Sequence, residues 1–215
     1  MLTVESLPIA ANPFRELMSS TVLYMSMSLD GFIAGPNESV DNGLGDGGER
    51  LHEWIFAGDP TEHGGVPGRP EGVNGEVMDE AMATGAVVAG RGTFEPAKGW
   101  GGDYHDGVPI FILSRQEAGV DPRWPLVSYV PNVETAMARA KEAAGDQDVL
   151  VHGATVAQLA LAAGVLDEIQ IHLIPVLLGE GRPLFEHLGA NQIELEPVRV
   201  LEGSGVTHLR YRVCR

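Results

Sequence analysis

The sequence of 215 residues has few cysteines, few basic residues and no long apolar run, and each shortage excludes a class of protein. Its one cysteine, Cys214, excludes an internal disulfide and any zinc cluster built on several cysteines, and it is typical of a reducing compartment. No stretch reaches the roughly 20 apolar residues of a membrane-spanning helix, and the N-terminal residues lack the basic and apolar segments of a secretory signal. We therefore expect a cytoplasmic protein that does not bind a membrane.

Basic residues are also scarce: the sequence has 14 Lys and Arg and 30 Asp and Glu, which gives a formal net charge of −16. This charge repels a phosphate backbone and no basic stripe offsets it, so nucleic acid is not an expected partner. The seven histidines show no His-Glu-x-x-His or other ligand spacing, which argues against a metal site. Glycine is abundant instead, with 28 residues, so many turns must use positive φ or approach a ligand closely.

Apolar runs alternate with amphipathic segments along the chain. Strands are predicted from residue 21, at 86–90, 108–114, 126–130, 149–152 and 168–179, and the last two strands alternate and join near Gly203 to Gly205. Helices are predicted at 49–57, at 74–82, at 133–144 and from 155. The pattern indicates an α/β protein with a mainly parallel sheet and a C-terminal antiparallel hairpin. We expect an N-terminal arm at 1–20, one domain at 21–215 and a long surface loop at 58–75 that could act as a lid.

Local signals predict where three of these helices begin. Asn74 and Asn132 precede apolar periodic segments as N-cap residues do, and Gly85 follows the first of these helices as a stop. Thr155 and Gln158 have the spacing of a capping box, which would fix the start of a third helix. The amides at that start would then point at the Gly153 corner, as in an anion-binding site, although an ordinary strand-to-helix turn explains this segment about equally well.

Two other predicted strand ends carry groups that bind phosphate. Gly90-Arg91-Gly92-Thr93 follows one apolar strand and supplies a guanidinium and a hydroxyl. Ser114-Arg115 ends the next strand with the same two groups. Either arginine alone is more often a surface charge, but ligands of α/β sheets bind outside the carboxyl ends of strands. A nucleotide cofactor with several phosphates is the simplest common ligand for the three ends.

Four segments, in their order and spacing, resemble the dihydrofolate-reductase-like superfamily, and in particular the stand-alone relatives of the riboflavin-biosynthesis (RibD) C-terminal reductase domain. They read SMSLDGFIAGPN, VVAGRGTFE, IFILSR and VLVHGATVAQLALAAGVLDEIQIHLIPVLLGEGRPLF. The resemblance runs from about Thr21 to the C-terminus. It implies a three-layer fold with helices on both faces of the sheet, a homodimer, and hydride transfer from NADPH to a small heterocyclic substrate.

The resemblance also implies which residues hold the cofactor. The adenosine 2′-phosphate would lie against one group of residues: Gly90, Arg91, Gly92, Thr93, Ser114 and Arg115. The pyrophosphate would lie against a second group: His152, Gly153, Ala154, Thr155 and Val156. The nicotinamide would lie against a third: Ser26, Ile33, Ala34 and Gly35. The chain departs from the family where it has His152-Gly153 in place of two glycines and Tyr24 in place of a lysine.

Three residues are candidates for substrate contact or proton supply: Asp30 at the end of the first strand, and Glu49 and His52 on the facing helix. Asp30 is equally well explained as a turn residue beside Gly31. The substrate stays open between pterins, folates and ribosylaminopyrimidines, which include 5-amino-6-(5-phosphoribosylamino)uracil. Two further alternatives stay open, a catalytically silent nucleotide-binding dimer that acts as a sensor or assembly partner and a purely structural dimer.

Overall fold

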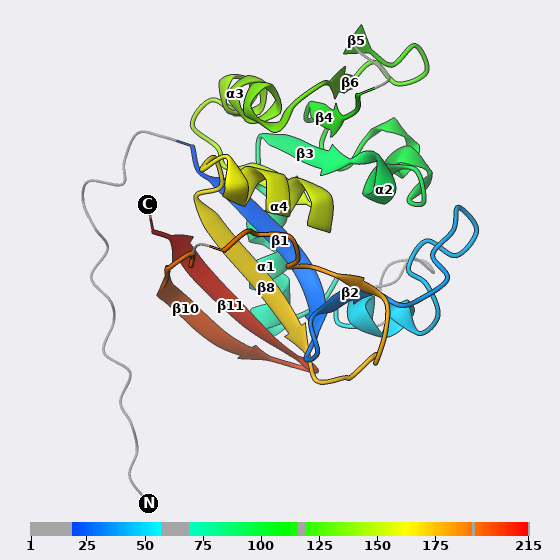
Figure 1. The fold of residues 1–215 in the computed structure, drawn as a ribbon, viewed down its shortest axis with the longest axis vertical. Coiled ribbons are helices and arrows are strands. Elements are labelled where there is room, and N and C mark those ends of the chain that lie inside the picture. Colours follow the sequence, from blue (N-terminus) through cyan, green and yellow to red (C-terminus); the bar gives the residue numbers. More distant parts are fainter. Residues whose placement is uncertain (1–18, 57–68, 116–118, 191, 215) are drawn as a thin grey trace, which may run out of the picture.

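The computed structural model of the protein describes residues 19–56, 69–115, 119–190 and 192–214, and Figure 1 shows their arrangement. Most of the N-terminal arm predicted at 1–20 lies outside these residues. So does most of the loop predicted at 58–75, including any lid function assigned to it.

The centre of the fold is a nine-stranded sheet with the order β10-β11-β8-β1-β7-β3-β4-β6-β5. An interior strand, β1 (Thr21–Ser28), pairs in parallel with β7 (Val149–His152) on one side and with β8 (Glu168–Ile174) on the other. The parallel part continues from β7 through β3 (Ala86–Gly90), β4 (Ile110–Leu113) and β6 (Val127–Val130). The carboxyl ends of β7, β3 and β4 therefore meet at one edge of the sheet.

Antiparallel strands complete both sides of the sheet. The hairpin of β10 (Leu195–Gly203) and β11 (Val206–Val213) pairs with β8, and the short β5 (Gly119–Val120) pairs with β6. A separate two-stranded sheet joins β2 (Phe32–Ala34) to β9 (Arg182–Pro183). The structure thus confirms the predicted mainly parallel sheet with a C-terminal antiparallel hairpin.

Helices cover both faces of the large sheet, which confirms the three-layer arrangement (Figure 1). One apolar core lies between the sheet and the pair α3 (Val133–Ala144) and α4 (Ala154–Ala162). A second core lies on the opposite face, where α1 (Gly72–Met82) and α2 (Arg91–Phe94) pack. Two 3₁₀ helices, η1 (Gly48–His52) and η2 (Lys98–Gly102), complete the described helical elements.

The start of α3 follows its predicted cap. The side chain of Asn132 accepts a hydrogen bond from the backbone N–H of Thr135 at 2.9 Å. The predicted apolar stripe of this helix is buried in full: Val133, Ala136, Met137, Ala140 and Ala144. The predicted helix at 49–57 was only partly right, because the regular part is the shorter η1. Its spacing still directs Leu51 and Trp54 into a buried cluster.

Three predicted caps were wrong because tertiary partners take the groups involved. α1 begins at Gly72, ahead of Asn74, and its C-cap is Ala83 rather than Gly85. The buried Asn74 side chain instead accepts from His208 Nε2 and donates to the carbonyl of Ser204, both at 3.1 Å.

The capping box at Thr155 also failed. Gly153 holds the N-cap position of α4, where no side chain caps the helix. The Gln158 side chain donates to the carbonyl of Leu184 at 2.9 Å instead of turning back to the helix start. Thr155 is exposed and lines the cavity described below.

Candidate functional site

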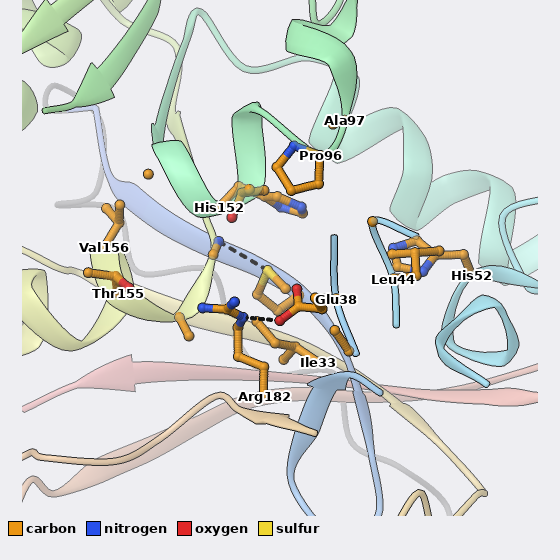
Figure 2. Close-up of a pocket in the computed structure, with 18 of the residues that line it drawn as sticks. Ile33, Glu38, Leu44, His52, Pro96, Ala97, His152, Thr155, Val156 and Arg182 are labelled. Atoms are coloured by element: carbon orange, nitrogen blue, oxygen red, sulfur yellow. Dashed lines mark hydrogen bonds and ion pairs between the residues drawn. The ribbon is translucent and has the colours of Figure 1, made fainter. Parts of the chain in front are cut away.

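A cavity of about 270 Å³ lies where β3 and β7 end, beside β2 (Figure 2). Its wall comes from segments far apart in the chain: Met25 of β1, the end of β2, the loop after it, the turn after β3, the β7–α4 corner and Arg182 of β9. The parallel sheet brings the first, middle and last thirds of the chain together at this point. This is the edge at which the sequence predicted a ligand.

Gly153 forms the corner of the cavity between β7 and α4. Its φ of 98° favours glycine, and a Cβ at this position would collide with Oγ1 of Thr93. The Gly153 N–H points to the sulfur of Met25 at 3.2 Å, which holds the corner against β1. The first residues of α4 line the cavity, so the positive end of the helix dipole and the hydroxyls of Thr93 and Thr155 face the same space.

The structure brings together part of the predicted phosphate site. Gly90, Gly92 and Thr93 line the same cavity as the predicted residues of the corner: His152, Gly153, Ala154, Thr155 and Val156. Arg91, Ser114 and Arg115 lie outside its lining, although β3 and β4 are neighbours and Gly90 pairs with Leu113. Arg91 forms an ion pair with Glu95, with Nε–Oε1 and Nη2–Oε1 distances of 2.7 and 2.5 Å.

Only some of the residues predicted to bind the nicotinamide line the cavity. Ile33 and Ala34 of β2 are buried and line the cavity. Gly35 lies one residue further, with its N–H bonded to the carbonyl of Leu44 at 2.8 Å, outside the lining. Ser26 is buried behind the wall, where its hydroxyl accepts from the indole N–H of Trp54 at 2.9 Å. The end of β2 is thus the part of this group that a ligand in the cavity would touch.

Of the three candidates for substrate contact, only His52 lines the cavity. Asp30 lies outside it, and its carboxylate accepts from the Ser28 hydroxyl at 2.6 Å and from the amides of Leu178 and Gly179 at 3.1 and 2.7 Å. The hydrogen bond from Ser28, followed by those amides, lowers the pKa of Asp30. Glu49 is exposed on η1 and also lies outside the lining. The geometry of Asp30 is that of a residue that fixes a turn.

The cavity is lined by two histidines, His52 and His152, whose rings are uncharged and can form hydrogen bonds. Burial lowers the pKa of His52, and burial together with the neighbouring His52 lowers the pKa of His152 to about 4. His152 Nδ1 lies 2.9 Å from the carbonyl of Tyr24, which only accepts, so Nδ1 carries the proton and Nε2 has a free lone pair. At neutral pH the ring of His152 is therefore a hydrogen-bond acceptor beside the cavity.

An aromatic wall stands next to His152. Trp100 lines the cavity, and its ring centroid lies 4.8 Å from that of Tyr104 and 6.4 Å from that of His152. Trp100 has φ 49° within η2, a left-handed conformation that costs roughly 1 to 2 kcal/mol for a residue with a side chain. The turn keeps this conformation because neighbouring Gly99 packs against the ring of Trp124, where a Cβ would collide.

Sequence reasoning missed several residues of the wall, above all Glu38 and Arg182. The Nε of Arg182 lies 2.5 Å from Oε2 of Glu38 across the cavity (Figure 2). Met25, Gly43, Leu44, Pro96 and Ala97 complete the missed set. The run GLGDGG, which contains Gly43 and Leu44, has the G-x-G-x-x-G spacing, but no predicted strand leads into it, so the match does not indicate a dinucleotide-binding turn. Only its position after β2 could have suggested the cavity.

The donor set of the cavity fits a dinucleotide. Glycine at 90, 92 and 153 lets a ligand approach the backbone closely, and the start of α4 and two threonine hydroxyls add donors for phosphate oxygens. Apolar side chains of β2 offer a flat wall for a ring. Among the residues that the structure describes, no group of three or more His, Cys, Asp or Glu could hold a metal ion.

The fold is that of the α/β domains whose ligands lie outside the carboxyl ends of parallel strands. The chain belongs to the RibD C-terminal domain family, whose profile matches residues 20–209. It is 29% identical over 172 residues to the uncharacterized protein YwjB of Bacillus subtilis, a match that covers 78% of this chain and 83% of YwjB.

Two solved structures show the same fold. The putative riboflavin biosynthesis protein of Shewanella sp. PV-4 matches with a TM-score of 0.68 at 22% identity, over 91% of this chain and 99% of that one. The pyrimidine reductase-like protein of Corynebacterium diphtheriae matches with a TM-score of 0.63 at 14% identity, over 96% of each chain. None of the helices that the structure describes is long and apolar enough to cross a membrane.

Proposed function

We propose that the protein is an NADPH-dependent reductase that transfers hydride to a small heterocyclic substrate of the ribosylaminopyrimidine or pterin type. One observation supports this most: the Gly153 corner, the start of α4 and the hydroxyl of Thr93 share a cavity with two neutral histidines. Family membership supports the reductase class, and the description of one similar protein as pyrimidine reductase-like supports the substrate class.

Residues of the cavity and of the neighbouring strand ends would hold different parts of the cofactor. The Gly153 corner and the start of α4 would hold the pyrophosphate, Arg91 with Ser114 would hold the 2′-phosphate, and Ile33 with Ala34 would lie against the nicotinamide. NADPH, when bound, supplies the hydride. The chain must then orient an electrophilic carbon beside the cofactor, exclude water and position a proton.

His52 and His152 are best placed for substrate contact. Both rings are neutral at pH 7, so they offer hydrogen-bonding groups rather than a charge, and His152, which donates its N–H to Tyr24, offers the lone pair on Nε2. The lone pair on Nε2 of His152 favours a ligand that presents an N–H or O–H group. Heterocycles with amino and lactam groups, such as aminopyrimidines and pterins, meet this requirement.

The test is a titration of the protein with NADPH and NADH, followed by assays of NADPH oxidation with pterins, folates, ribosylaminopyrimidines and nitro compounds. We expect saturable binding with a preference for NADPH. Arg91→Ala should weaken NADPH binding by roughly 1.5 to 3 kcal/mol, the range of a charge-assisted hydrogen bond, and should leave NADH binding nearly unchanged. Equal losses for both cofactors would show that Arg91 does not bind the 2′-phosphate.

Saturable binding without oxidation of any substrate would favour a silent nucleotide-binding dimer, and no binding would contradict the proposal. The catalytically silent dimer is the less favoured alternative, because the cavity has more than the glycine corner needed to bind a nucleotide. Two histidines that can hydrogen-bond to a substrate also line it. We further propose that the enzyme is a cytoplasmic homodimer that acts on a small molecule and binds neither nucleic acid nor membrane. Its size in solution is measurable by light scattering.

A further inference from the structure

Arg182 and Glu38 form an ion pair inside the cavity. Among the described residues that line it, Arg182 is the only arginine or lysine and Glu38 is the only carboxylate. Their side chains come from β9 and from the loop after β2, and they are 41% and 17% exposed. The pair is therefore accessible to a ligand, and it leaves this part of the cavity with almost no net charge.

The guanidinium of Arg182 lies next to the phosphate-binding groups. A Cβ built on Gly92 would lie 3.8 Å from Nη1 of Arg182, so this nitrogen is beside the turn that follows β3. Figure 2 shows the Arg182 side chain between Thr155 of α4 on one side and Glu38 on the other. The same guanidinium thus borders the turn after β3 and lines the same cavity as the start of α4.

The chemistry of the pair suggests how it meets an anion. Glu38 contacts Arg182 at Nε, while a guanidinium has two further nitrogens that bind phosphate oxygens in a fork. A dinucleotide brings negative charge to a protein whose formal net charge is already −16. A carboxylate beside that charge opposes binding, and a guanidinium favours it.

We propose that Arg182 binds the pyrophosphate of the dinucleotide and that Glu38 is an internal competitor that holds the guanidinium in place before the cofactor arrives. The proposal rests on the proposed function. It assigns Arg182 a different phosphate from Arg91, since the pyrophosphate is common to NADPH and NADH whereas the 2′-phosphate is present only in NADPH. Loss of Arg182 must therefore weaken both cofactors, in contrast to loss of Arg91.

The test measures the Kd of NADPH, NADH and inorganic pyrophosphate by calorimetry for the wild-type protein and for Arg182→Gln, Arg182→Lys and Glu38→Gln. The matched control is Arg212→Gln, which removes the same charge from the exposed ion pair with Glu196. For Arg182→Gln we expect the Kd of both cofactors to rise roughly 10-fold to 150-fold, the range of a charge-assisted hydrogen bond. Arg182→Lys should retain part of the affinity, and Arg212→Gln should match the wild type.

Glu38→Gln should lower the Kd of all three probes, because it removes the competing charge and keeps a hydrogen-bond acceptor for Arg182. An unchanged Kd in Arg182→Gln would overturn the inference and leave the proposed function standing. A raised Kd in Glu38→Gln would overturn the competition. A wild-type protein that binds pyrophosphate through Arg182 but binds neither dinucleotide would contradict the proposed function alone. Thermal melting of each variant shows that it is folded, and if Arg182→Gln does not fold, Arg182→Lys and Glu38→Gln decide the question.

Discussion

Substitution of Gly153 by alanine tests the construction of the β7–α4 corner most directly. Gly153 has φ 98° and ψ 149°, a combination that costs a residue with a side chain roughly 1 to 3 kcal/mol. The new Cβ would also collide with Oγ1 of Thr93, and overpacking of this kind costs about 1 to 3 kcal/mol more. We therefore expect Gly153→Ala to lower the free energy of unfolding by roughly 2 to 6 kcal/mol, a large part of the total stability of a typical domain.

Two further variants separate the backbone cost from the collision. Thr93→Ala removes the hydroxyl that the new Cβ would meet, so the double variant should recover the steric part and keep the backbone part. Gly164→Ala is the matched control, because Gly164 has φ 66° and no atom within 4 Å of an added Cβ. This control should lose only about 1 to 2 kcal/mol, the cost of the left-handed conformation.

The assay is urea unfolding followed by circular dichroism and by tryptophan fluorescence, with coincident curves as the test of two-state behaviour. A Gly153→Ala protein within about 0.5 kcal/mol of the wild type, the usual range of a harmless surface substitution, would refute the described corner. A double variant with full stability would show that the backbone conformation carries no cost.

Three other predictions concern stability. Asn74→Ala should lower the free energy of unfolding in urea by about 1 to 3 kcal/mol, because it leaves buried polar groups unpaired. Asn132→Ala should lower it by about 1 kcal/mol, because it removes a helix cap. Equal losses in the two variants would contradict this difference. Hydrogen bonds from Arg123 hold the pKa of Asp121 well below its usual value, so Asp121→Asn should lower the free energy of unfolding at pH 7. The difference between variant and wild type should shrink as the pH falls below about 4, which urea unfolding at a series of pH values would show. Burial lowers the pKa of His208 to about 4, so on acidification the unfolded chain takes up a proton at this residue before the folded protein does. The free energy of unfolding should therefore fall from about pH 6.5 toward pH 4, and His208→Gln should reduce this dependence when unfolding is measured across pH.

The sequence predicted those parts of the fold that depend on local patterns. Buried parallel strands are continuous apolar runs because both faces are covered, and β3 and β7 were recognisable for this reason. α3 was recognisable because its cap and apolar stripe are both local. The glycine corner at Gly153 was also recognisable, since a strand that turns sharply into a helix there requires an unusual φ.

The failures have a common physical cause. Asn74 and Asn132 have similar local contexts, but the side chain of Asn74 is used by His208, 134 positions later. The side chain of Gln158 goes to Leu184 instead of to its own helix. The pair of Glu38 and Arg182 is separated by 144 positions, and neither residue lies in a local motif that predicts the other. The hydrogen-bond partners of these polar side chains are set by the tertiary fold, so the local sequence around each residue does not predict them.

The central position of β1 has a consequence for synthesis on the ribosome. This strand begins at Thr21, but its two neighbours in the sheet begin only at Val149 and Glu168. While the intervening residues are being translated, the early segment TVLYMSMS emerges with both hydrogen-bonding edges open. This aggregation-prone strand therefore stays unpaired until most of the protein has been made, so expression should benefit from chaperones that bind extended apolar peptides.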